Sequence, residues 1–343
     1  MHPTDSALYA AIHAQPDEMR RLLAEGRDGA ARAAALLRGR SVRLVGIGTS
    51  FHAACVGAWL LTEAGIEARA AHSFDVALYG RDLDPNAAYI LISHRGTKTY
   101  SRQAGERIAA LGAPCVAITA QGAPAPPVTL HLETVPNERS SAHTVSYTGA
   151  LTLLALIAAE LGAERVRAAL PALPDIIAAV LAREDAVRAC ADGIAAARFV
   201  TLTGAGPNEI TATEGALKLK ETAYLLAEGL GVEQLLHGPL VALGPQDVLI
   251  AVRVPGPAIA RLDAVCDVAR AIGVRVLVAG DDPAQGPLAV PTIERLPEVL
   301  TPFVTVVPLQ LLACFASGVR GTNPDSFRAD DPRYRDAFAR IAL

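Results

Sequence analysis

The sequence has little that would bind it to nucleic acid, to an anionic membrane or to a metal ion. Its 31 lysines and arginines nearly balance its 35 aspartates and glutamates, so a net charge of −4 gives no general attraction to polyanions. The five cysteines are widely spaced without a C-x-x-C pair, which argues against disulfides and thiolate metal sites. The eight histidines show no H-E-x-x-H spacing. We therefore expect no cofactor, no metal, no nucleic-acid partner and a reducing, cytoplasmic location.

Membrane signals are also scarce. The N-terminus carries acidic residues early and lacks the basic-then-apolar pattern of a signal peptide. The apolar stretch 148–162 is interrupted by Gly149, Thr152 and Glu160, which favours a buried helix over a membrane span. We expect a soluble protein.

The chain repeats itself. The run VRLVGIGTS at 42–50 and the run FVTLTGAGP at 199–207 each lead into a helix-like segment. Two further strand–glycine or helix–glycine junctions recur at nearly the same offset, about 160 residues later. Each copy alternates continuously apolar strands with helices, a pattern typical of parallel strands covered on both faces. The sequence therefore predicts an α/β fold with two tandem, doubly wound parallel sheets, as domains 1–175 and 176–343.

Two turns of the first copy are rich in hydrogen-bond donors. Gly48, Thr49 and Ser50 open a helix after the first strand, where backbone N–H groups and hydroxyls suit phosphate oxygens, although an ordinary helix cap has the same residues. The next such turn carries hydroxyl, imidazole and cationic side chains around one glycine: Ser93, His94, Arg95, Thr97 and Lys98. Arginine and lysine neutralise phosphates and carboxylates, so we expect an anion site here, with a solvated basic turn as the alternative.

The second copy differs at the matching turn. Its residues 253–257 have no hydroxyl, and Pro255 and Pro257 remove two N–H donors. The second copy instead holds Glu214, Lys218 and Glu221, whose i, i+4 and i+7 spacing places them on one helix face. This pattern indicates either a surface ion-pair ladder or catalytic carboxylates. His237 follows, at a turn before Gly-Pro, where a lone histidine is usually just solvated.

These motifs resemble the tandem SIS (sugar isomerase) family, and in particular the isomerase half of glutamine–fructose-6-phosphate aminotransferases. EGALKLKE with LLHGPL resembles the signature of that half, GIGTSFHAA its first phosphate turn and ISHRGTKT its second. NERSSAHTVSYTGAL at 137–151 and VVPLQLLACFASGVRGTNPD at 306–325 resemble further segments of it.

The resemblance implies roles at the matching positions. Glu221 would move a proton between C1 and C2 of an open-chain sugar, with Lys218 beside the substrate. His237 would open the sugar ring, on a loop that serves the neighbouring subunit of a homodimer. The two donor-rich turns would hold the phosphate.

The chain also departs from that family. It shows no glutaminase region, Arg95 and Lys98 stand where the synthase has hydroxyls, and the tail has no lysine. We therefore expect a freestanding phosphosugar isomerase, or an aminosugar-phosphate deaminase or deglycase. A non-catalytic sugar-phosphate sensor is the alternative from another class. A nucleotide-dependent oxidoreductase is a third and weaker reading, because G-I-G-T-S-F lacks the last glycine of G-x-G-x-x-G.

Overall fold

The computed structural model describes residues 2–341 and contains two parallel five-stranded sheets with the same strand order. The first sheet has the order β2-β1-β3-β4-β5, with bounds Ala68–His72, Val42–Gly46, Ala88–Ile92, Cys115–Thr119 and Leu130–Glu133. The second has the order β7-β6-β8-β9-β10, with bounds Ala227–Gly231, Val200–Gly204, Val248–Arg253, Arg275–Gly280 and Leu288–Ala289. The predicted α/β class and the two doubly wound sheets are confirmed.

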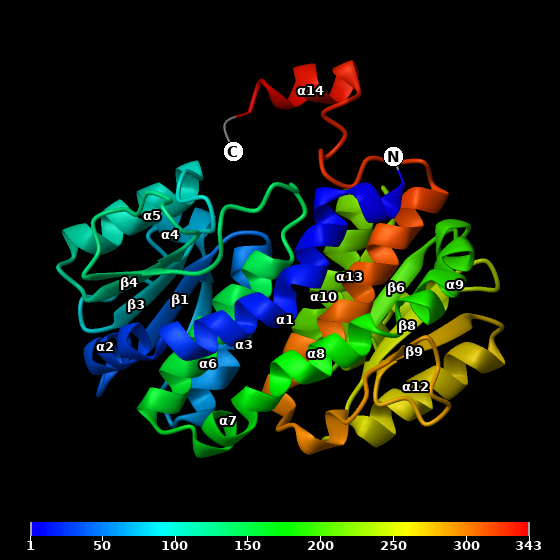
Figure 1. The fold of residues 1–343 in the computed structure, drawn as a ribbon, viewed down its shortest axis with the longest axis horizontal. Coiled ribbons are helices and arrows are strands. Elements are labelled where there is room, and N and C mark those ends of the chain that lie inside the picture. The colour runs from blue at the N-terminus through cyan, green and yellow to red at the C-terminus, as the bar shows by residue number, and fades with distance from the viewer. Residues whose placement is uncertain (1, 342–343) are drawn as a thin grey trace. The chain divides into compact units, whose positions relative to one another are not determined.

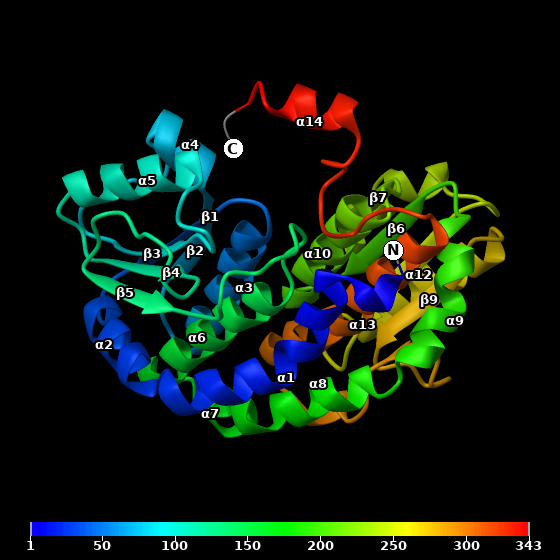
Figure 2. The same cartoon turned by 45° about the horizontal axis from the view of Figure 1, so that its top comes forward.

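Helices cover both faces of each sheet, giving three layers (Figures 1 and 2). Around the first sheet α2, α3 and α6 lie on one face and α4 and α5 on the other; α7 follows α6. Their bounds are Arg27–Leu37, Thr49–Glu63, Val145–Leu161, Ser73–Tyr79, Thr99–Ala110 and Glu164–Ala169. Around the second sheet α8, α9, α10 and α13 pack together on one face, and α11 and α12 cover the other. Their bounds are Leu173–Leu181, Glu184–Ala195, Pro207–Thr222, Pro302–Val319, Val232–Leu236 and Ile259–Ala271. The chain begins with α1, Ala7–Glu25, and ends with α14, Pro332–Phe338.

The chain divides into two compact units. The first-sheet unit comprises 17–138, 143–171 and the chain from 336, and the second-sheet unit comprises the chain up to 16, 139–142 and 172–335. The division falls close to the predicted boundary at 175, with three short segments assigned to the other unit: 2–16, 139–142 and 336–341. The assignment of one domain to 1–175 and another to 176–343 stays a prediction.

The internal repeat extends to backbone detail. Gly48 caps α3 at φ 58° and ψ −134°, and Gly206, 158 residues later, caps α10 at φ 53° and ψ −132°. These left-handed values suit glycine and turn each strand sharply into its helix. Both strand-to-helix turns therefore present helix N-termini at the carboxyl edge of their sheet, where ligands of such folds bind.

Two very apolar helices form the centres of the units. In α6 nearly every residue is buried, as the sequence predicted for this stretch. Within residues 2–341 one helix, Glu298–Val319, is long and apolar enough to cross a membrane, but its apolar window is entirely buried inside the protein. It has the surroundings of a core helix.

Candidate functional site

A concavity lies at the carboxyl edge of the first sheet. It encloses about 290 Å³ of empty space, and Thr49, Ser50 and His94 from the two donor-rich turns are among the residues that line it. The remaining lining residues come from β3, β4, the segment after β5, α3 and α6: Ala53, Ile92, Ile118, Thr119, Thr134, His143, Ser146, Tyr147 and Ala150. The polar lining consists of hydroxyls and imidazoles without a charged side chain. Such a wall suits the hydroxyls of a sugar more than a bare anion.

His94 is a neutral donor in this wall. It is buried, and its Nε2 accepts a hydrogen bond from the backbone N–H of Glu138 at 3.0 Å. Burial, with a further contribution from the Arg95 charge, lowers the pKa of His94 to about 4. The neutral ring then carries its proton on Nδ1, which has no hydrogen-bond partner among residues 2–341. An unsatisfied buried donor of this kind is costly unless a ligand or water accepts its proton.

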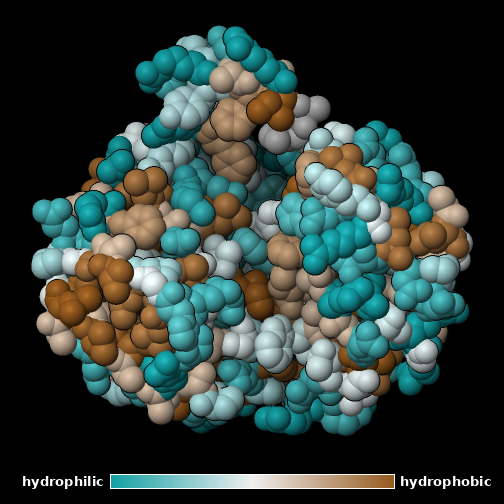
Figure 3. All heavy atoms as spheres, turned by 180° about the vertical axis from the view of Figure 1, so that it is seen from behind, coloured by the Kyte–Doolittle hydropathy of each residue, from teal (hydrophilic) through white to brown (hydrophobic). Residues whose placement is uncertain are grey.

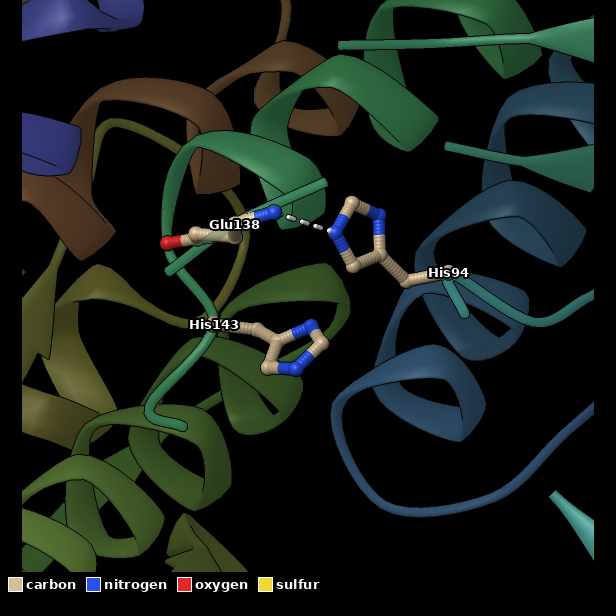
Figure 4. A group of neighbouring side chains, drawn as sticks. All are labelled: His94, Glu138 and His143. Carbon is tan, nitrogen blue, oxygen red and sulfur yellow. Dashed lines mark hydrogen bonds between the residues drawn. The ribbon is translucent and has the colours of Figure 1, made fainter. Parts of the chain in front are cut away.

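His94, Glu138 and His143 form a cluster whose potential metal-ligating atoms lie within 4.8 Å of one another (Figure 4). The spacing of the histidines in the sequence gave no sign of it. The Nε2 of His94 and the Glu138 carboxylate are already engaged, however: Nε2 accepts the Glu138 N–H, and the carboxylate accepts four hydrogen bonds, from the N–H and hydroxyl groups of Thr144 and Ser146. That carboxylate stabilises the N-terminus of α6. The cluster therefore fits a hydrogen-bonded network better than an ion site.

The cations of the second turn lie outside the residues that line the concavity. Five of the predicted binding residues are not among those that line the concavity in the described chain: Gly48, Ser93, Arg95, Thr97 and Lys98. Burial, followed by repulsion from Arg95, lowers the pKa of Lys98. Neither cation has an ion pair with a carboxylate of residues 2–341, and the Nε of Arg95 and the Oγ of Ser93 are buried without partners there. Two neighbouring cations without counter-ions favour an anion as their partner.

Gly96 holds this turn in place. Its φ is +66°, and a Cβ at this position would lie 1.8 Å from the carbonyl oxygen of Pro124, so a side chain cannot be accommodated. The turn consequently passes directly against the backbone of the neighbouring loop, and its donors are fixed by the backbone.

The matching turns of the second sheet are occupied by the protein's own charges. Arg253 is paired with Asp263 and Asp281, each at 2.7 Å. The Glu298 carboxylate lies against both glycine turns, since a Cβ at Gly206 would be 3.4 Å and one at Gly256 2.8 Å from its oxygens. Burial raises the pKa of Glu298. Arg253 is therefore compensated by carboxylates, whereas Arg95 at the matching turn of the first sheet has no such partner among residues 2–341.

The charged side chains of α10 in the second-sheet unit form a buried cluster and not a surface ion-pair ladder. On α10 the Nζ of Lys218 lies 3.2 Å from Glu214 and 2.6 Å from Glu221. The side chains of Lys218 and Glu214 are at most 1% exposed, whereas that of Glu221 is 17% exposed. Burial by itself would lower the pKa of Lys218, but the two carboxylates outweigh it and the net shift is upward. The two carboxylates therefore favour the charged form of Lys218, and Glu221 is the member of the cluster that solvent or a ligand can reach.

Among residues 2–341, His237 makes no hydrogen bond or ion pair with the members of this cluster. Its side chain is 78% exposed, and its Nε2 lies 3.4 Å from Glu233, one turn earlier. Leu226 and Val241 are 71% and 91% exposed in the same stretch of chain. On the face shown in Figure 3, hydrophobic surface likewise lies in patches between hydrophilic areas.

Sequence reasoning named Thr49, Ser50 and His94 but missed most of the wall they share. Thr119 is the last residue of β4 and Thr134 follows β5, each as a single hydroxyl that belongs to no motif. His143 and Ser146 lie in the stretch 137–151, which the family resemblance pointed to without singling out residues. The assignment of catalytic and binding roles to individual residues stays a prediction.

Known proteins resemble this chain in sequence and in fold. Residues 193–320 match the family model of the SIS domain. A glutamine–fructose-6-phosphate aminotransferase (isomerizing) of Pyrococcus horikoshii is 31% identical over 307 residues, which cover 84% of this chain and 51% of the relative. The chain thus spans about half the length of the curated relatives it matches.

Solved structures share the fold over nearly the whole chain. The tagatose-6-phosphate ketose/aldose isomerase of Escherichia coli superposes with a TM-score of 0.81 at 20% identity, covering 95% of this chain and 96% of that one. The glucosamine-6-phosphate deaminase of Thermotoga maritima gives 0.74 at 19% identity, covering 94% and 97%. The family model itself covers one region, and SIS membership of the first repeat stays a prediction. Residues 193–320, which hold the whole second sheet, are therefore the part of this chain that matches the SIS domain.

Proposed function

We propose that this chain acts on an open-chain sugar or aminosugar 6-phosphate by moving a proton between C1 and C2. The reaction is an aldose–ketose isomerisation, or the deamination or deglycation of an aminosugar phosphate that uses the same proton transfer. Glu221 is the base, Lys218 lies beside the substrate, and His237 opens the sugar ring.

The observation that carries this proposal is the partial exposure of Glu221 beside a fully buried lysine. In this cluster the lysine and Glu214 are sealed, while Glu221 remains reachable. A reachable carboxylate next to fixed charges is the arrangement from which general bases are made. The relatives and structural neighbours, which their names describe as acting on phosphosugars, support the same class of reaction.

The phosphate is assigned to the first-sheet unit. Arg95 and Lys98 supply cationic side chains that have no carboxylate partner among residues 2–341. Gly48 precedes a helix whose N–H groups attract anions, and the hydroxyl wall takes the polyol. Thr97 and Ser93 add hydroxyls to the same turn. A phosphosugar satisfies both the cations and the neutral donors, which a simple anion does not.

The exposed His237 favours a homodimer in which this loop serves a neighbouring chain. A histidine that is 78% exposed cannot protonate a sugar in a pocket of which it forms no part. Exposed Leu226 and Val241 give the loop an apolar surface that a second copy could bury.

The alternative function is a sugar-phosphate sensor, which the uncompensated cations alone would also support. Incubation of the protein in deuterated water with hexose and hexosamine 6-phosphates separates the two. The enzyme incorporates deuterium at C1 or C2 of at least one sugar, detected by mass spectrometry or NMR. A protein that binds these ligands by calorimetry and exchanges no proton in any of them is a sensor. Release of ammonia or of another amine distinguishes a deaminase or deglycase from an isomerase.

A further inference from the structure

The last turn of α10, which carries Glu221, is tied to a segment a hundred residues later. The hydroxyl of Thr322 donates to the carbonyl oxygen of Thr222 at 2.6 Å. The hydroxyl of Tyr224 donates to the carbonyl oxygen of Asn323 at 3.1 Å and accepts from the backbone N–H of Arg328 at 2.9 Å. We call the segment Thr322–Arg328 the clasp. All of these residues belong to the second-sheet unit.

The backbone is strained at this contact. Tyr224, Phe327 and Arg328 have φ values of 53°, 48° and 61°, in the left-handed region that bulky side chains avoid. Such conformations persist where surrounding contacts over-determine them, and they gather at functional sites. Here both partners of the contact are strained, one at the end of α10 and the other in the clasp.

Ring stacking adds to the hydrogen bonds. The Arg328 guanidinium lies 4.2 Å from the centre of the Tyr224 ring and 4.6 Å from that of Tyr334, so that it is held between two aromatic faces. The Arg328 guanidinium also donates to the Tyr334 hydroxyl.

The clasp is itself anchored at its middle. The Asp325 carboxylate accepts the N–H groups of Ala7 and Leu8, each at 2.9 Å, at the start of α1. The Asp325 carbonyl oxygen accepts the N–H of Ser141 at 3.0 Å. The segment that holds Tyr224 is therefore fixed to two other parts of the same unit.

The end of a helix frays, because its last carbonyl groups have no partner within the helix. Glu221 lies in this last turn, one residue before α10 ends. Proton transfer requires the base to be held to within a fraction of an ångström, so a fraying turn would be a poor support. The ion pair with Lys218 fixes the tip of the Glu221 side chain, whereas the backbone of the last turn is held by the clasp and by the Thr222 hydroxyl, which donates to the carbonyl oxygen of Ala313 on α13.

We propose that the clasp is a positioning element for Glu221 and that Tyr224 is its main contact. This inference rests on the proposed role of Glu221 as the base. Tyr224 acts through the end of α10 and touches no substrate. We therefore expect loss of its contacts to slow the proton transfer and to leave the affinity for the substrate unchanged.

The test is Tyr224→Phe, which keeps the ring under Arg328 and removes the two hydrogen bonds of the hydroxyl. Tyr79→Phe, at a tyrosine that is 74% exposed in the first-sheet unit, is the matched control. Amide hydrogen exchange of residues 218–222 and substrate deuteration at saturating sugar phosphate are measured on both. In Tyr224→Phe we expect protection of this turn to fall about tenfold and the deuteration kcat to fall, with KM and the midpoint of unfolding nearly unchanged.

Unchanged protection in Tyr224→Phe would show that the clasp does not hold the helix end. Lower protection with an unchanged kcat would show that it holds the helix end without positioning the base. A merely structural role would lower the unfolding midpoint and leave the kcat of the folded protein alone. If the unaltered protein deuterates no sugar, the proposed function fails, and the clasp is then judged by the protection of the helix end alone.

Discussion

Replacing Arg95 by alanine tests the anion site directly. Arg95 has no carboxylate partner within residues 2–341, so its removal leaves no acid unpaired. The free energy lost with Arg95 is therefore binding free energy of the ligand. A hydrogen bond to a charged group contributes about 1.5–3 kcal/mol, which corresponds to a roughly 10- to 150-fold weaker Kd for a phosphosugar. Burial lowers the pKa of Lys98 and repulsion from Arg95 lowers it further; loss of Arg95 removes the second of these causes, so we expect Lys98 to retain part of the affinity.

Isothermal titration calorimetry with a hexose 6-phosphate, at fixed low ionic strength, measures the effect. Arg253→Lys is the matched control, because Arg253 occupies the corresponding turn of the second sheet and is already paired with Asp263 and Asp281. We expect one phosphosugar per chain, weaker binding in Arg95→Ala and unchanged binding in Arg253→Lys. Wild-type affinity in Arg95→Ala, or two ligands per chain, would refute the assignment of a single anion site to the first sheet.

Three further predictions concern the rest of the site. Lys218→Met leaves two carboxylates without their buried cation and should lower the free energy of unfolding, measured by urea titration, by about 3–5 kcal/mol. Lys220→Met, at an exposed lysine of the same helix, should change it by less than about 0.5 kcal/mol. Equal effects of the two substitutions would contradict the buried cluster. The pKa of His94 is lowered to about 4 in the folded protein, so the unfolded chain binds this proton first as the pH falls. About 3 kcal/mol of stability that is present above pH 6.5 should therefore be lost as the pH falls towards 4, and a His94→Gln protein should lose less. Titration of His94 near pH 6.5, followed by NMR, would contradict this prediction. Inactive Glu221→Gln and His237→Ala chains, once mixed and shown to exchange subunits, should regain activity in hybrid dimers, and no regain would place the pocket within one chain.

The sequence was sufficient to predict the central strands and the repeat. β1, β3, β6 and β8 are continuous apolar runs between glycine turns, because both of their faces are covered by helices. The edge strands escaped notice. β2, with only one of its five residues buried, and β7, with glycines at two positions, lack the apolar run that marks a buried strand.

The two donor-rich turns at 48–50 and 93–98 could be recognised in the sequence, but only Thr49, Ser50 and His94 of them line the concavity in the described chain, and the roles of their residues stay predictions. The rest of the polar wall comes from single hydroxyls and His143, which folding brings together from β4, the segment after β5 and α6. Spacing could place Glu214, Lys218 and Glu221 on one face of α10, but it could not tell a buried cluster from a surface ladder. Burial of that face depends on packing of α10 against α13, some ninety residues further along the chain.

Deuterium exchange by Glu221→Gln tests the central claim most directly. The substitution keeps the shape of the side chain and removes the base, so deuteration of the sugar in deuterated water should slow by about 10²- to 10⁴-fold, the usual contribution of general acid–base catalysis. Sugar-phosphate binding, measured on the same protein, should stay close to that of the wild type, because the cations assigned to the phosphate are unchanged. Glu228→Gln, at an exposed carboxylate of β7, should exchange at the wild-type rate. Exchange at the wild-type rate in Glu221→Gln would contradict the account, since another group would then be moving the proton.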